Sequence, residues 1–78
     1  MPKLNQLAIN DEGFVFDPIT GESYTVNSSG LVILNGLKAS YPQEQIIDLL
    51  INDFEVTHEH AERDILDFMD HLKSFKLV

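Results

Sequence analysis

Large apolar residues recur at every second position in the first third of the chain, as they do in β-strands that bury one face. The alternating positions are Leu7 and Ile9 around Ala8, Phe14 and Phe16 around Val15, and Tyr24 and Val26 around Thr25. This period of two predicts strands over residues 6–10, 14–16 and 22–27. Turn-forming residues separate them, including Pro18, which presets φ, and Gly21, which tolerates a positive φ. We expect a meander with the second strand in the centre and the third at an open edge.

Helical periodicity follows the strands. Capping residues at 27–29 (Asn-Ser-Ser) precede a helix that is apolar on nearly every side as far as Leu37, as expected of a core helix. A second helix is predicted over residues 42–54, with a proline at its first position. Thr57 can cap a third helix over 59–76. Its apolar residues recur at steps of four, three, four and three: Ala61, Ile65, Phe68, Leu72 and Phe75.

Three strands followed by three helices predict an α+β fold. This is the element order of a winged-helix-like domain with an N-terminal three-stranded antiparallel sheet. We expect a single domain over residues 1–78, because a chain of this length has room for one core. Residues 1–5 are expected to be disordered, and the three residues 76–78 are too few to settle whether they form an extended tail.

Composition narrows the classes of partner. Thirteen acidic residues against five basic ones give a formal charge of −8. Such a surface repels phosphate backbones, so we expect no nucleic-acid partner, whereas a cationic segment of a peptide or an enzyme is attracted. The absence of cysteine excludes disulfides, thiolate catalysis and cysteine-based zinc sites. No signal peptide and no run of ~20 apolar residues is found, which predicts a soluble cytoplasmic protein without a membrane partner.

The junction between the third strand and the first long helix has a distinctive sequence. Residues 24–34 read YTVNSSGLVIL: a hydrophobic residue, Asn, two small polar residues, Gly and an apolar helix. Together with FDPITGE (16–22), IIDLL (46–50) and DILDFMDHL (64–72), this stretch resembles the family of the pyrroloquinoline-quinone biosynthesis protein D (PqqD). Members of that family are small peptide chaperones, also called RiPP recognition elements. The resemblance extends from about Leu7 to the end of the chain and rests on a pattern over its whole length.

Two departures from the family pattern concern the partner more than the fold. A Gly commonly follows the first helix in the family, where this chain has Lys-Ala-Ser-Tyr at 38–41. The family often has an aromatic residue inside that helix, where this chain has Ile33 or Leu34.

The resemblance implies a non-enzymatic module without a cofactor. Such a module holds a ribosomally made precursor peptide and presents it to a modifying enzyme, often a radical-SAM enzyme. In the family mode the peptide adds as a fourth strand in the groove between the third strand and the third helix. The strand residues that would bind it are Glu22, Ser23, Tyr24, Thr25, Val26 and Asn27.

A second stripe on the third helix is a candidate for the helical wall of this groove. It comprises Glu62, Leu66, Met69 and Lys73, at steps of four, three and four. Methionine adapts its shape to varied ligands. Two alternatives stay open: the stripe contacts a peptide, or Leu66 and Met69 flank the core. The third strand likewise either accepts a peptide through main-chain hydrogen bonds or is a solvated edge.

Other polar constellations are interpreted as solvated faces. His60, Asp64, Asp67 and His71 share one face of the third helix at spacings that can hold zinc, but the sequence offers no partners to orient them, so no metal site is predicted. Acid pairs such as Asp48 and Asp53 lack a surrounding cleft, so no catalytic residue is predicted. The third helix carries five acids against three basic residues, the wrong sign for a DNA-contacting helix.

The leading hypothesis is therefore a cytoplasmic peptide chaperone or recognition module that serves a radical-SAM or other peptide-modifying enzyme. The alternative is a structural or regulatory protein-interaction domain of the same fold with no precursor peptide. We expect a monomer or a weak homodimer. The sequence identifies neither the peptide nor the enzyme.

Overall fold

A computed structural model describes residues 2–77 of the chain, and Met1 and Val78 lie outside the described part. The elements are α1 (Pro2–Asn5), β1 (Ala8–Ile9), β2 (Phe14–Phe16), β3 (Ser23–Thr25), α2 (Ser28–Lys38), α3 (Gln43–Phe54) and α4 (His58–Ser74). The strands form one antiparallel sheet in the order β1-β2-β3. The predicted α+β fold is confirmed, and β3 lies at the edge of the sheet as expected.

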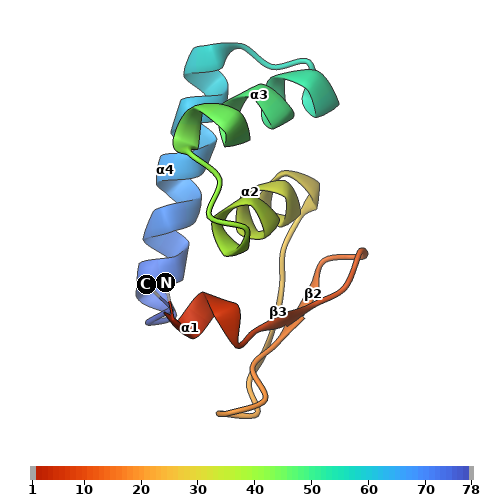
Figure 1. The fold of residues 1–78 in the computed structure, drawn as a ribbon, viewed down its shortest axis with the longest axis vertical. Coiled ribbons are helices and arrows are strands. Elements are labelled where there is room, and N and C mark those ends of the chain that lie inside the picture. The colour runs from red at the N-terminus through yellow and green to blue at the C-terminus, as the bar shows by residue number, and fades with distance from the viewer. Residues whose placement is uncertain (1, 78) are drawn as a thin grey trace.

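The layers are stacked along the long axis of the molecule (Figure 1). The sheet lies at one end, α2 crosses the middle, and α3 packs on α2 and α4 at the other end. Helix α4 runs beside all of them, along most of the length of the molecule. Within residues 2–77, none of the helices combines the length and the hydrophobicity needed to cross a membrane.

The β2–β3 hairpin is organised by Asp17, a buried acid with 3 % of its surface exposed. Its Oδ1 accepts hydrogen bonds from the amides of Ile19 (2.9 Å) and Thr20 (3.4 Å). Gly21 closes the turn with φ +78°, a conformation that glycine adopts without strain. The hairpin thus fixes β3 in register with β2.

The sheet has one buried and one exposed face. Val15 pairs with Ile9 on one side and Tyr24 on the other, and it is 2 % exposed, so these three residues face the helices. Phe14 and Phe16 point the other way and are 55 % and 45 % exposed. The sequence Phe-Val-Phe is apolar at every position, so its alternation predicts a strand without showing which face is buried.

Helix α2 is the centre of the core. Its N-cap Asn27 accepts a hydrogen bond from the Gly30 amide at 2.8 Å, which starts the helix directly after β3. Leu34 packs toward the sheet, and Ile33 packs against α3 and α4. Both side chains are 1 % exposed, so the helix is buried on two sides, as its sequence predicts.

The chain ends join this core. Residues 2–5, for which disorder was the expectation, form α1, because Leu4 is fully buried against Leu7 and the α2 side of the sheet. Leu77 is 5 % exposed and belongs to the same cluster, and Lys76 reverses the chain with φ +60°. The sequence left open whether residues 76–78 form an extended tail; in the structure Phe75 and Lys76 form a turn, Leu77 follows it, and Val78 lies outside the described residues.

Candidate functional site

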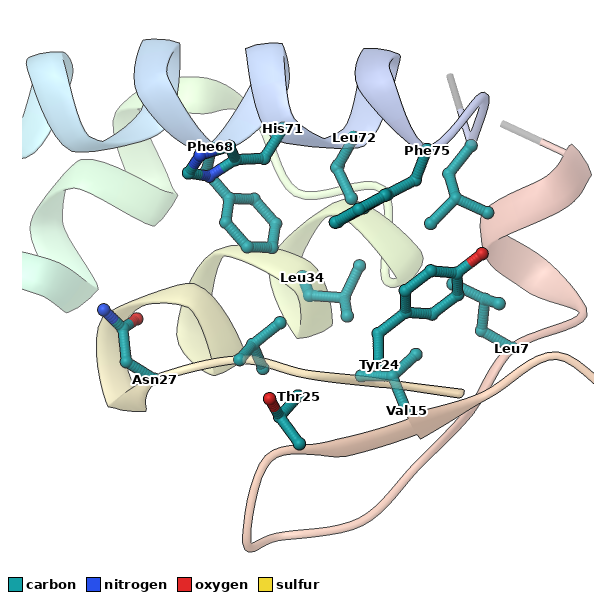
Figure 2. Close-up of a pocket in the computed structure, with 12 residues that line it drawn as sticks. Leu7, Val15, Tyr24, Thr25, Asn27, Leu34, Phe68, His71, Leu72 and Phe75 are labelled. Carbon is teal, nitrogen blue, oxygen red and sulfur yellow. The ribbon is translucent and has the colours of Figure 1, made fainter. Parts of the chain in front are cut away.

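A groove of about 320 Å³ separates β3 from the C-terminal half of α4 (Figure 2). Residues 24–27 form one wall. The opposite wall consists of three α4 residues and the C-cap residue of that helix: Phe68, His71, Leu72 and Phe75. The floor is made of four core side chains: Leu7, Val15, Leu34 and Leu77. No Cα atom of β3 lies within 8 Å of a Cα atom of α4, so only side chains span the space between the two elements.

The open side of β3 offers main-chain hydrogen-bonding groups. The Val26 amide donates to the Gly13 carbonyl (2.9 Å), and the Glu22 carbonyl accepts from the Asp17 amide (2.8 Å). Alternate residues of an antiparallel strand direct these groups to opposite sides, so Ser23 and Thr25 direct theirs away from β2. Among residues 2–77, no strand pairs with this side of β3. The edge is therefore available to another chain.

An aromatic pair closes one end of the groove. The rings of Tyr24 and Phe75 face each other with their centroids 4.8 Å apart and their planes inclined by 37° (Figure 2). The Tyr24 hydroxyl donates a hydrogen bond of 2.6 Å to Oε2 of Glu22. This hydrogen bond raises the pKa of the Tyr24 phenol, and its partial burial and the charges of Glu22 and Asp17 act in the same direction. The phenol is thus held neutral and fixed in orientation beside the groove.

The other end of the groove is polar. There, Asn27, Phe68 and His71 are shared with a smaller hollow that extends to the start of α2 and to two acids of α4, Asp64 and Asp67. A chain lying in the groove therefore passes from an aromatic end, over an apolar floor, to an acidic end.

The structure separates the two groups of residues that the sequence suggested for peptide binding. Four of the six strand residues, those at 24–27, line the groove. Glu22 holds the Tyr24 hydroxyl, and Ser23 lies on the open edge. The α4 stripe of Glu62, Leu66, Met69 and Lys73 does not line the groove.

The geometry of α4 explains where that stripe lies. At 100° per residue, its members lie on one flank of the buried stripe formed by Ala61, Ile65 and Leu72, whereas Phe68, His71 and Phe75 lie on the other flank. Met69 packs, half-buried, against both parts of the core, and Leu66 is 58 % exposed. Periodicity marks the core stripe of a helix, but it does not show which flank faces the sheet. The sequence assigned Phe68 and Phe75 to the core stripe alone, so their place in the groove wall was missed.

The candidate metal ligands are not brought together. His60 Nε2 lies 3.3 Å from Asp64 Oδ2, on exposed and half-buried side chains. Across residues 2–77, no group of three or more His, Asp or Glu side chains is placed to hold a metal ion. His71 instead lines the groove.

Comparison with known families identifies the chain. The profile of the family described as Coenzyme PQQ synthesis protein D (PqqD) matches residues 12–78. The chain belongs to the PqqD family. No curated protein sequence matches this PqqD-family chain.

Two solved structures share the fold of this PqqD-family chain, and both contain a peptide. One is described as lasso peptide synthetase B1 complexed with the leader peptide; it has a TM-score of 0.71 and 28 % identity, covering 87 % of this chain and 81 % of that one. The other is TbiB1 in complex with the TbiA(beta) leader peptide; it has a TM-score of 0.75 and 25 % identity, covering 91 % and 84 %. The resemblance inferred from the sequence is thus confirmed.

Proposed function

We propose that this chain is a non-catalytic recognition module that binds the leader segment of a ribosomally made precursor peptide and presents it to a peptide-modifying enzyme. The observation that carries this proposal is the unpaired edge of β3 beside a groove with an apolar floor. Two proteins of the same fold are described as complexes with leader peptides, which supports it.

The peptide is proposed to add as a fourth strand. Neighbouring strands lie about 4.8 Å apart, so the guest strand would lie beside the open edge of β3, along the groove between β3 and α4. Its backbone would pair with the outward groups of Ser23 and Thr25 whatever its sequence. Its alternate side chains would enter the groove and contact Leu34, Phe68 and Leu72. Backbone pairing gives affinity, and the groove gives selectivity.

The affinity is expected to be moderate. Ordering a flexible peptide costs roughly 2 to 5 kcal/mol of the gross interaction energy, so a dissociation constant on the order of micromolar is expected for a short segment. Such an affinity suits a module that must release the peptide to an enzyme.

The placement of the titratable groups supports the non-catalytic part of the proposal. Asp17 is the one charged side chain that is buried among the described residues, and its oxygens accept hydrogen bonds within the hairpin. The groove contains an exposed histidine, His71, and the other polar residues of its lining are Tyr24, Thr25 and Asn27, with no acid, serine or cysteine among them. We place the module in the cytoplasm, where a ribosomal peptide is made.

Nuclear magnetic resonance titration of ¹⁵N-labelled protein tests this function. The probe is the leader segment of any precursor peptide whose gene neighbours that of this chain, and a scrambled version is the control. Shifts are expected at 23–27 and on the α4 flank of Phe68, His71 and Phe75. If the leader at millimolar excess causes no shift, the proposal is overturned, and a regulatory interaction domain without a precursor peptide becomes the better explanation.

A further inference from the structure

The outer face of the sheet exposes an aromatic pair that the fold does not use. Phe14 and Phe16, two positions apart on β2, are 55 % and 45 % exposed. The register places Thr25 beside Phe14, and Ala8 and Ser23 on either side of Phe16, and these three neighbours are exposed as well. The core clusters lie on the opposite face of the sheet, with Val15 as the inward residue of β2. Within residues 2–77, this aromatic face is covered by nothing.

Folding alone does not account for two phenylalanines here. Threonine or another β-branched residue suits a solvent-facing strand position, as Thr25 shows on the neighbouring edge strand β3. Contiguous exposed apolar residues on a small protein mark interaction sites, and aromatic residues are enriched at the centres of interfaces. The pair therefore has the chemistry of an interface centre.

Phe14 and Phe16 lie on the same face of the sheet as half of the side chains of the proposed guest strand. A strand paired with β3 continues the sheet, and every second side chain of that strand points to the outer face. Those side chains would lie next to Ser23 and Thr25, in the rows that contain Phe16 and Phe14. A protein that docks on the aromatic face thus contacts the module and the guest peptide at once.

The acidic residues around the aromatic face indicate which kind of protein can dock on it. From residue 4 to residue 37 the chain has no Lys or Arg, while the acids Asp11 and Glu12 occupy the β1–β2 turn and Glu22 precedes β3. A second copy would bring the same acids, and a net charge of −8, against this face. Like charges across an interface are unfavourable, whereas a basic rim is complementary.

We infer that the aromatic face is the docking surface for the peptide-modifying enzyme, and that the matching surface of that enzyme is an apolar depression rimmed by Lys or Arg. This inference rests on the proposed function, because the guest strand supplies part of the composite face. The floor of the groove and the aromatic face are on different sides of the sheet, and Phe14 and Phe16 do not line the groove, so substitutions of these two residues disrupt the aromatic face separately.

The test measures two affinities on the same variants. The double variant F14T/F16T keeps strand-forming residues and removes both rings. The matched control is Phe54→Thr, which removes a ring that is 36 % exposed at the end of α3, an element that packs only on helices. The probes are the leader peptide and any purified peptide-modifying enzyme whose gene neighbours that of this chain, and thermal unfolding checks that each variant is folded.

Wild-type protein loaded with the leader is expected to bind the enzyme more tightly than unloaded protein, and by linkage the enzyme tightens leader binding by the same factor. F14T/F16T is expected to weaken enzyme binding by about tenfold or more, as loss of an interface centre does, with leader affinity within about twofold of wild type. Phe54→Thr is expected to leave both affinities unchanged.

The inference is overturned, with the proposed function intact, if F14T/F16T binds the leader and the enzyme as wild type does, or if wild-type protein binds the leader but not the enzyme. It is also overturned if the double substitution only abolishes self-association in analytical ultracentrifugation, since the occupant of the face would then be a second copy. Failure of wild-type protein to bind the leader would instead refute the proposed function.

Discussion

At the scale of single residues, the site depends on side chains that hold β3 in place more than on reactive groups. Asp17 is the main example. Its carboxylate accepts hydrogen bonds from two amides of the hairpin turn, and it also accepts a hydrogen bond from the side chain of Gln6 (3.4 Å). Burial alone would raise the pKa of Asp17. Hydrogen bonds from the amides of Ile19 and Thr20 and from the side chains of Thr20 and Gln6 outweigh it and hold the pKa below the ordinary value of 3.8.

Asp17→Ala is expected to lower the melting temperature by about 5 °C at pH 7, because it leaves turn amides without their acceptor. A group whose pKa is depressed by folding stabilises above its unfolded-state pKa, and that contribution is lost as the pH falls through the folded-state pKa. The difference between wild type and variant should therefore be full at pH 7 and should shrink below about pH 4. Circular dichroism melts at pH 7 and pH 3 measure it.

The control for this variant is Asp11→Ala, which removes an exposed acid from the other turn of the sheet. It is expected to change the melting temperature by less than about 2 °C at either pH. A loss for Asp17→Ala that is equal at pH 7 and pH 3 would contradict the assigned role of the carboxylate.

At the scale of elements, the strands and helices follow from local sequence, whereas the faces they present do not. Asn27 and Thr57 cap α2 and α4 as expected, accepting from Gly30 and His60 at 2.8 and 3.1 Å. The buried face of β2 and the groove-facing flank of α4 depend on how sheet and helix pack together, and neither an apolar triplet nor a helical stripe contains that information. The edge position of β3 was predictable, since it follows from the order of the hairpins.

Thr25→Pro tests the edge of β3. Its amide points away from β2, so the substitution removes a donor for the guest strand and costs no hydrogen bond of the sheet. Leader affinity is expected to fall about 3- to 10-fold, the value of one net hydrogen bond, while the protein remains folded. Fluorescence anisotropy with labelled leader measures the affinity.

Two comparison variants sharpen this experiment. Thr25→Val keeps the amide and should bind the leader more tightly than Thr25→Pro. Val26→Pro removes the amide that donates to Gly13 and should destabilise the hairpin itself. Equal binding by Thr25→Pro and Thr25→Val would argue against a guest strand on this edge.

At the scale of the whole molecule, charge and shape favour a particular guest. The chain has a formal net charge of −8, and two of its acids, Asp64 and Asp67, lie at the polar end of the groove. Long-range attraction of this kind accelerates the encounter with a cationic peptide more than it slows dissociation.

The association rate of a Lys-rich leader is therefore expected to fall about tenfold between low salt and 0.5 M NaCl, with a much smaller change in the dissociation rate. Stopped-flow fluorescence separates the two rates. Substituting Asp64 and Asp67 with Asn should flatten the salt dependence, and the same two substitutions at Asp48 and Asp53, on α3, should flatten it less. A salt effect confined to the dissociation rate would contradict electrostatic steering.

The two ends of the described chain meet, since the Lys3 ammonium donates to the Lys76 carbonyl at 3.0 Å. Figure 1 shows that the two ends lie near the C-terminal end of α4, next to α1. The whole domain could thus be inserted into another protein, because both of its ends would connect to nearly the same point of the host chain. Grafting into a surface loop of an unrelated carrier, or permuting the chain by joining these ends, should preserve the architecture.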